Sequence, residues 1–235
     1  QVSPFRPEEL PFLNLASIRL ADSGKEVLLV EKEKLGGQCL SNRCMMVCAL
    51  NDVARFFSSG KSLSRQGIVD SLSEPDFSAL IRGFREVESK ISSVIEMETR
   101  NSGVETLTGK EAAVEGKKVI IGDEILEPDN IIISTGSVPR IPEIPGISRD
   151  GVYTYRTIAE IGKVPRKITI IGGGVSSLEY AYIFSSLGSE VTLVARSKIL
   201  KDFPEKIRKA AFNELSEVAI HENTDIVSID GEERL

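Results

Sequence analysis

Three cysteines lie close together and are the only cysteines in the chain: Cys39, Cys44 and Cys48. The spacing C-x4-C-x3-C is near that of plant-type iron–sulfur sites, but its second interval differs, and no fourth cysteine or nearby histidine completes a ligand set. Buried structural cysteines are a second interpretation. We favour a third interpretation, a redox-active disulfide, and expect no metal here.

The pairing of these cysteines depends on local backbone shape. Residues five apart in a regular helix are separated by about 7.5 Å along its axis and point in different directions. A disulfide needs Cα atoms within roughly 4.4–6.8 Å, so a Cys39–Cys44 bridge requires a loop or a distorted helix start, which Gly36 and Gly37 would permit. A Cys44–Cys48 bridge on one helix face remains possible. Because no secretory signal pattern is present, we expect a cytoplasmic protein whose disulfide is catalytic rather than structural.

A glycine turn is the second chemical signal. The apolar residues 168–171 run into Gly172-Gly-Gly174-Val-Ser-Ser177 and then into a helical pattern. In such a G-x-G-x-x-S turn, Gly172 permits the tight bend, Gly174 lets a pyrophosphate approach the backbone, and the small Ser177 allows close helix–strand packing. The strand–turn–helix context predicts a dinucleotide site. The alternative is a glycine turn without a ligand.

The end of the following strand bears on which nucleotide binds. An NAD site places an acid there to hold the ribose hydroxyls, whereas this strand ends at Ala195 and is followed by Arg196 and, further on, Lys201. These cations could receive a 2′-phosphate, the arginine through its planar fork. The pattern favours NADPH over NADH, with solvated surface cations as the alternative.

The elements that must position these residues alternate between strands and helices. We expect helices over residues 13–23, from 77 to about 95, over 176–187 and over 203–218, and strands over 27–30, 119–121, 124–126, 131–133, 168–171, 191–195 and 219–229. Such alternation predicts an α/β fold with a doubly wound parallel sheet. Pro139, Pro142 and Pro145 interrupt the pattern, so we place a domain boundary near Ile147 and expect domains 1–147 and 148–235.

Composition narrows the classes of partner. The 235 residues carry a net charge of −6, and 41% are hydrophobic, as in an ordinary globular protein. An acidic chain without a dense Lys/Arg block argues against nucleic acid as its main partner. No apolar run approaches the roughly 18 residues of a membrane span, so we expect no membrane partner.

The motifs together resemble the flavin-dependent pyridine nucleotide–disulfide oxidoreductases, which include dihydrolipoamide dehydrogenase, glutathione reductase and mercuric reductase. The resemblance rests on Gly-Gly-x-Cys-x4-Cys at 36–44, the G-x-G-x-x-S turn and Ser-Thr-Gly-Ser at 134–137. It implies two Rossmann-like units, one for FAD carrying the cysteines and a partial one for NAD(P). It also implies a relay from NADPH through FAD to a Cys39–Cys44 pair and on to a disulfide or soft-metal substrate, in a homo-oligomer.

The same resemblance assigns roles to individual residues. Cys44 resembles the thiol beside the flavin and Cys39 the interchange thiol that attacks substrate. The implied cofactor-binding residues are Glu31 (FAD ribose) and its neighbour Lys32; Gly36, Gly37 and Gln38 (flavin-side loop); Ala112 (adenine); Thr135, Gly136 and Ser137 (flavin-binding turn); Gly172, Gly174, Val175 and Ser176 (nucleotide turn); Glu179 (near the nicotinamide); and Arg196 and Lys201.

The chain also departs from the family pattern. Residues 8–13, where the family has its FAD glycine motif, contain no glycine, and Cys48 stands where a lysine often pairs with the acid at Glu179. We read the only histidine, His221, as structural. The chain has about half the family length, so a second chain or copy is a possible source of the rest. The alternatives are a non-catalytic nucleotide-binding relative or split subunit lacking FAD, and a flavin-free thiol-redox or metal-binding protein.

Overall fold

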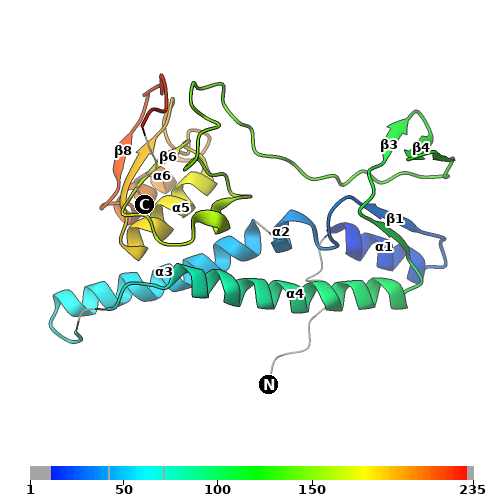
Figure 1. Cartoon of the computed structure of the whole chain (residues 1–235), viewed down its shortest axis with the longest axis horizontal. Helices are drawn as coiled ribbons and strands as arrows, with labels where there is room; N and C mark the ends of the chain where they lie inside the picture. The colour runs from blue at the N-terminus through cyan, green and yellow to red at the C-terminus, as the bar shows by residue number, and fades with distance from the viewer. Residues whose placement is uncertain (1–11, 42, 71, 232–235) are drawn as a thin grey trace. The chain divides into compact units, whose positions relative to one another are not determined.

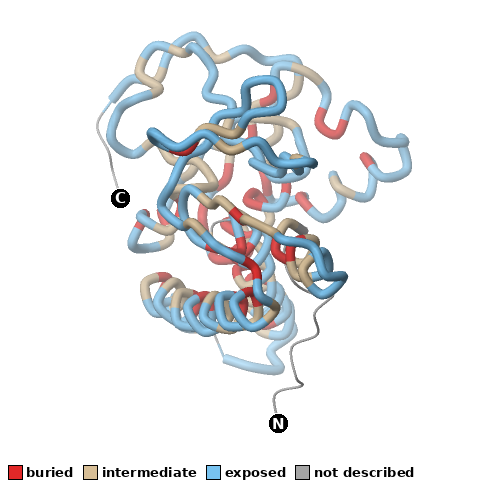
Figure 2. The backbone as a smooth tube through the Cα atoms, turned by 90° about the vertical axis from the view of Figure 1, so that its right-hand side faces the viewer, coloured by how far each residue is buried: buried red, intermediate tan, exposed pale blue. Residues whose placement is uncertain are grey.

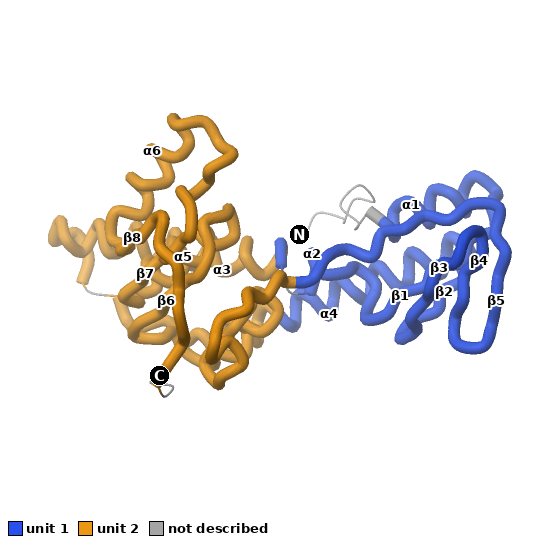
Figure 3. Tube along the Cα trace, turned by 90° about the horizontal axis from the view of Figure 1, so that it is seen from above, with its two compact units in different colours: residues 1–44, 85–138 blue, residues 45–84, 139–235 orange. Residues whose placement is uncertain are grey.

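The computed structural model describes residues 12–41, 43–70 and 72–231, which form two compact units (Figure 3). Unit 1 contains residues 1–44 and 85–138, and unit 2 contains residues 45–84 and 139–235. Each unit is therefore made of two separate segments of the chain. The two ligand-binding domains expected from the sequence are each a single continuous segment. The division into 1–147 and 148–235 therefore stays a prediction.

Unit 1 is built on a two-stranded parallel sheet. Strand β1 (Leu28–Glu31) pairs with β2 (Glu105–Thr108) and is preceded by helix α1 (Phe12–Asp22). Gly24 ends α1 with a positive φ of 81°, and its N–H donates to the carbonyl of Ala21 at 2.8 Å. Helix α2 (Gly37–Ser41) and residues 85–101 of α4 (Phe77–Asn101) complete the unit's helices. The predicted helix 13–23 and strand 27–30 are confirmed to within a residue.

The small core of unit 1 explains which faces these elements bury. Its buried apolar side chains are Leu29, Leu35, Leu40, Ile95 and Val104, with one face of α1 packed against them. Three antiparallel strands follow along the chain, β3 (Ala113–Glu115), β4 (Lys118–Ile121) and β5 (Glu124–Leu126). The turn at Gly122, whose φ is +62°, confirms the predicted hairpin.

The strand predicted at residues 131–133 is wrong. These residues are not in a strand, and Ile132 and Ile133 are 52% and 68% exposed. A strand is stabilised by a neighbour that satisfies its backbone groups and covers its side chains. Among the residues that the structure describes, the parallel sheet of unit 1 contains β1 and β2 alone, so this apolar segment has no such neighbour.

Unit 2 contains a three-stranded parallel sheet in the order β6-β7-β8. Strand β6 (Lys167–Ile171) leads through α5 (Val175–Leu187) to β7 (Glu190–Val194), which leads through α6 (Glu205–Glu214) to β8 (Ala219–His221). The register places Ile168 opposite Val191 and Leu193 opposite Ile220. Figure 1 shows α5 alongside this sheet. The expected α/β alternation with a parallel sheet is thus confirmed.

Two elements predicted in unit 2, a helix and a strand, are longer than those in the structure. The helix predicted over 203–218 extends only over α6, because Pro204 occupies its N-cap with an extended ψ of 146° and Leu215 its C-cap. The strand predicted over 219–229 ends at His221. Asn223 has a φ of +51°, which turns the chain out of the extended conformation.

The larger core belongs to unit 2. Figure 2 shows the buried stretches of the whole chain in red. Helix α5 is apolar on most of its surface and is covered by the sheet and by α3 (Cys44–Arg65), which contributes Met46, Leu50 and Ala54 at a spacing of four. The start of α4 adds Phe77, whose ring lies 6.2 Å from that of Phe184. The 3₁₀ helix η2 (Ile158–Ile161) closes the cluster. None of the helices described here is long and apolar enough to cross a membrane.

Candidate functional site

The structure joins Cys39 to Cys44 in a disulfide whose Cα atoms are 4.7 Å apart. Cys39 lies in the short helix α2, and Cys44 is the first residue of α3. The break between the two helices provides the non-helical geometry that the spacing requires. Cys48 is a free, exposed thiol on α3, so the alternative Cys44–Cys48 bridge is not formed. Both bridged cysteines are exposed, which leaves the disulfide accessible to a redox partner.

The two glycines at the start of α2, Gly36 and Gly37, are required for different physical reasons. Gly36 has a φ of +103°, and a Cβ there would lie 2.6 Å from Cδ2 of Leu40 and 3.5 Å from Cδ1 of Ile95. Its N–H donates to Oδ1 of the buried Asn14 at 3.2 Å. Gly37 has a φ of +60° and no atom near its absent Cβ. Gly36 therefore lets the loop pack into the core, and Gly37 turns the chain toward Cys39.

Two segments that the sequence assigned to a flavin lie side by side. The amide Nε2 of Gln38 donates to the carbonyl of Ser137, across 99 positions of sequence. The nearest heavy atom to a Cβ on Gly136 is that same Nε2, at 3.9 Å, and Gly136 has a φ of +69°. Thr135, Gly136 and Ser137 are all exposed. The residue next to Gln38 is Cys39, so this contact lies directly beside the disulfide.

Glu31 ends strand β1, the position at which an acid binds ribose in a Rossmann unit. Its Oε1 accepts a hydrogen bond from the N–H of Glu33 at 2.8 Å. Lys32 forms an exposed ion pair with Glu111 and lowers the pKa of that carboxyl, mainly by hydrogen bonding. Ala112 follows Glu111 and is exposed.

The residues of unit 1 would suit part of a flavin site. Glu31 fits a ribose, and the contact between Gln38 and Ser137 fits the side of a flavin next to the disulfide. A pyrophosphate cradle needs glycine at the start of the first helix, and the sequence has no glycine before Gly24. Most of the stretch expected to replace that motif, residues 8–11, lies outside the described residues.

The glycine turn of unit 2 fits a pyridine nucleotide. Gly172 has a φ of +135°, and a Cβ there would lie 2.6 Å from Oγ of Ser177, so the two small residues are required together. Gly174 is the N-cap of the 13-residue helix α5, and nothing lies within 4 Å of its absent Cβ. Val175 and Ser176 are exposed in the first turn. The open space and the helix N-terminus together suit a pyrophosphate.

Gly173 has a packing role that the sequence interpretation missed. A Cβ at this position would lie 3.1 Å from Cβ of Ala195 and 3.3 Å from Cα of Ile199. The carbonyl of Gly173 accepts a hydrogen bond from the N–H of Leu200 at 2.7 Å. The glycine turn is therefore packed on the loop that carries Arg196 and Lys201, both exposed. The signal available in the sequence was that all three consecutive positions, 172–174, are glycine.

His221 contributes to this loop through its backbone. Its carbonyl accepts a hydrogen bond from the N–H of Ala195 at 2.9 Å, and its exposed imidazole lies on β8. Among the described residues no three His, Cys, Asp or Glu side chains are grouped as ligands for a metal ion.

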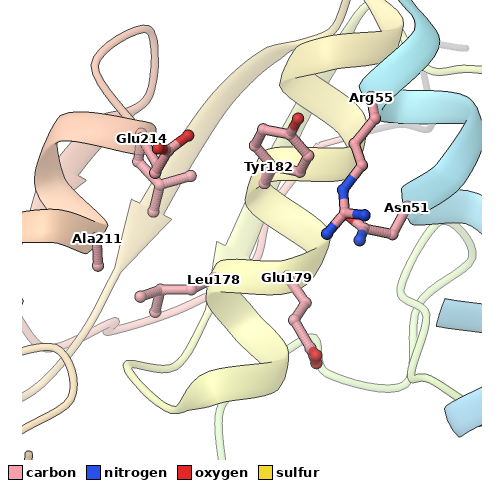
Figure 4. Close-up of a pocket in the computed structure, with 8 residues that line it drawn as sticks. Asn51, Arg55, Leu178, Glu179, Tyr182, Ala211 and Glu214 are labelled. Carbon is pink, nitrogen blue, oxygen red and sulfur yellow. The ribbon is translucent and has the colours of Figure 1, made fainter. Parts of the chain in front are cut away.

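Glu179 lines a cavity of about 480 Å³ in unit 2, together with residues that the sequence interpretation missed. Figure 4 shows Asn51 and Arg55 on α3, with the Arg55 guanidinium between α3 and α5, and Tyr182 one turn of α5 beyond Glu179. Glu214 on α6 completes the polar part of the lining. Arg55 thus places a cation in the cavity that Glu179 lines. It lies on the same helix as Cys48, the position at which the family pattern often has a lysine.

The comparisons with known proteins identify the family of the chain. The family model for pyridine nucleotide-disulphide oxidoreductases matches residues 15–235. A dihydrolipoyl dehydrogenase of Acholeplasma laidlawii is 31% identical over 202 residues, covering 83% of this chain and 60% of that protein. A mercuric reductase of Lysinibacillus sphaericus is 26% identical over 208 residues, covering 88% and 38%.

A solved structure supports the fold. The HOCl-induced flavoprotein disulfide reductase RclA from Escherichia coli, in its Cu(II) complex, superimposes with a TM-score of 0.78 at 23% identity, over 94% of this chain and 48% of that one. The chain therefore spans about 40–60% of the length of these relatives. Because the family model matches nearly the whole chain, the protein belongs to the pyridine nucleotide-disulphide oxidoreductase family.

Proposed function

We propose that this chain provides the disulfide and the pyridine-nucleotide site of an NADPH-dependent disulfide reductase of the dihydrolipoamide dehydrogenase and mercuric reductase type. The observation that carries the proposal is the exposed Cys39–Cys44 disulfide at the junction of α2 and α3. A disulfide in a chain with a dinucleotide-type glycine turn suits electron transfer better than structural cross-linking. Family membership supports the same chemical class.

The nucleotide end of the reaction would be bound by unit 2. The N–H groups at the start of α5 would bind the pyrophosphate, and the open face of Gly174 would let it approach. Arg196 and Lys201 would bind the 2′-phosphate. A nicotinamide held there would supply a hydride, and an FAD held by Glu31, Gln38 and residues 135–137 would supply the two-electron chemistry that links that hydride to the disulfide.

The disulfide end would use the two cysteines in turn. Two electrons and two protons break the S–S bond and leave two thiols. The Cys39 thiolate would attack an external disulfide, release one thiolate and form a mixed disulfide. Cys44 would then displace the second thiolate and restore the Cys39–Cys44 bond.

The wider proposal concerns substrate and setting. The substrate class is a small-molecule or protein disulfide, or a soft metal ion that binds thiolate. We place the reaction in the cytoplasm and in a homo-oligomer.

The test of the cysteine assignment is thiol production. The chain is incubated with NADPH and added FAD under argon, alkylated with N-ethylmaleimide and weighed by mass spectrometry. We expect two adducts more than in a sample without nucleotide. Cys44→Ser should abolish this gain and any disulfide reduction while NADPH binding remains, and Cys48→Ser is the matched control that keeps the gain. Disulfide turnover by Cys44→Ser would refute the assignment.

The nucleotide preference has its own test. Arg196→Glu should shift the ratio of NADPH to NADH affinity toward NADH, because it replaces a phosphate-binding cation with an anion. Arg166→Glu is the matched control. Arg166 is exposed and lies just before the first residue of β6, whereas the glycine turn follows the last residue of that strand. An unchanged ratio in Arg196→Glu would contradict the proposed 2′-phosphate role.

A further inference from the structure

The loop after β7 is attached to the rest of unit 2 at both of its ends. At its start, the N–H of Ala195 donates to the carbonyl of His221 at 2.9 Å, and the carbonyl of Ala195 accepts from the N–H of Thr224 at 3.0 Å. At its end, the N–H of Leu200 donates to the carbonyl of Gly173 at 2.7 Å. Arg196 and Lys201 extend from this loop into solvent.

The loop contains a residue in an unfavourable conformation. Leu200 has a φ of +44°, in the left-handed region that is costly for a side chain with a Cβ. It is nevertheless 7% exposed and packed in the core. A conformation of this kind persists only where the surroundings over-determine it.

An ion pair holds the backbone next to Leu200. One carboxylate oxygen of Glu222 accepts hydrogen bonds from the N–H of Ile199 at 2.6 Å and from Nη2 of Arg208 at 3.1 Å. Nε of Arg208 donates to the carbonyl of Ile199 at 2.8 Å. Both backbone groups of Ile199 are thus held by one pair of charged side chains, from α6 and from the residue after β8.

The charge of Arg208 is engaged within the protein. Its side chain is 11% exposed, and Nη1 also pairs with Glu205 at 2.9 Å. Arg208 is therefore not placed as a phosphate ligand. Its contacts are to the backbone that carries the two exposed cations, which is the arrangement of a positioning residue.

We propose that the Arg208–Glu222 pair sets nucleotide selectivity by fixing the shape of the 196–201 loop, so that Arg196 and Lys201 meet the 2′-phosphate together. This inference rests on the proposed NADPH preference. If the pair only stabilised unit 2, removing it would lower the fraction of binding-competent protein and weaken the binding of every nucleotide by the same factor. If the pair positions the cations, removing it weakens the binding only of ligands that carry a 2′-phosphate.

The experiment compares adenosine 2′,5′-bisphosphate with AMP by isothermal titration calorimetry on the whole chain. We expect the wild-type chain to bind the bisphosphate at least about tenfold more tightly, the factor of one hydrogen bond to a charged group. Glu222→Ala and Arg208→Ala should bring the ratio of the two dissociation constants close to one while AMP binding stays near the wild-type value. Glu222→Gln, which retains the accepting oxygen, should keep most of the preference.

Lys209→Ala is the matched control, because it removes an exposed cation next to Arg208 on α6 without touching the loop. Its ratio should equal that of the wild type. If Arg208→Ala and Glu222→Ala weaken both ligands equally, the positioning role is overturned while the NADPH preference stands. Equal affinity of the wild-type chain for the two ligands would overturn both, and a fold defect in Arg208→Ala leaves the ratio in Glu222→Ala as the deciding value.

Discussion

At the scale of single residues, each of the three consecutive positions in the nucleotide turn is glycine for a different physical reason. Gly172 needs its positive φ, Gly173 needs the space beside Ala195, and Gly174 has space that nothing in the chain fills. The first two reasons concern the protein itself. The third concerns a ligand, so stability and binding can be separated by substitution.

Gly173→Ala should affect stability, and Gly174→Ala should affect nucleotide binding. In Gly173→Ala the new methyl is crowded against Ala195 and Ile199, and we expect a loss of about 1–3 kcal/mol in the free energy of unfolding. In Gly174→Ala the φ of −88° suits alanine and the methyl meets no atom, so unfolding should be unchanged while NADPH binding falls. Urea unfolding and nucleotide titration measure the two effects. Equal stability of the two variants would contradict these packing roles.

The cysteines make a residue-scale prediction that needs no cofactor. Because Cys39 and Cys44 are bridged and Cys48 is free and exposed, iodoacetamide should label Cys48 alone in the native, unreduced protein. Pretreatment with a phosphine reductant should add two labels, at Cys39 and Cys44. Peptide mapping by mass spectrometry locates them. A label on Cys44 before reduction would show that the bridge is absent or is formed by other cysteines.

At the scale of elements, α3 is tied to the chain after α6 by Arg65 and Glu217, whose Nη2 and Oε1 are 2.5 Å apart. The hydrogen bond from Arg65 lowers the pKa of Glu217 below its usual range. A carboxyl with a lowered pKa stabilises the fold above its unfolded-state pKa, and this contribution disappears as the pH falls through the folded-state value.

Glu217→Gln should therefore lower the free energy of unfolding at pH 7, by less than about 1 kcal/mol because both side chains are half exposed. The difference from wild type should shrink as the pH falls and should vanish once the pH is below the lowered folded-state pKa of Glu217, where the carboxyl is protonated in both states. Glu143→Gln, an exposed carboxyl in the proline-rich segment, is the control and should show no such difference. A difference that grows toward low pH would contradict the sign argued here.

The elements also show how far sequence patterns reach. Strand–turn–helix around Gly172 and the hairpin at Gly122 were predictable, because each is specified by residues next to one another. The apolar run at 131–133 was read as a strand, but burial depends on a neighbouring strand that its own sequence does not encode. The cavity lined by Glu179 and the hydrogen bond from Arg208 to the carbonyl of Ile199 each involve residues from separate elements. Spacing along the chain therefore gave no sign of Arg55, Arg208 or Glu222. The Cys39–Cys44 bridge lay between these cases, since spacing allowed it only with a break that the structure provides.

At the scale of the whole molecule, the two units have very different cores. Among the described residues, the cluster of unit 1 has five buried apolar side chains, and that of unit 2 has twenty. Apolar burial is the main favourable contribution to folding. Unit 1 also contains the disulfide, which closes a short loop and adds on the order of 2 kcal/mol by restricting the unfolded chain.

The redox state should therefore change the stability of one unit and leave the other as it was. In native-state hydrogen exchange, amides of β1 and β2 should exchange through lower-energy openings than amides of β6 and β7. Reducing the disulfide should speed exchange in β1 and β2 further, with β6 and β7 unchanged, because the cross-link closes a loop within residues 39–44, which belong to unit 1. The Cys48→Ser variant should behave as wild type, since Cys48 is outside the bridge. Equal acceleration in both sheets would mean that the units open together, and the reduction of Cys39–Cys44 would then be coupled to the nucleotide-binding sheet as well as to its own.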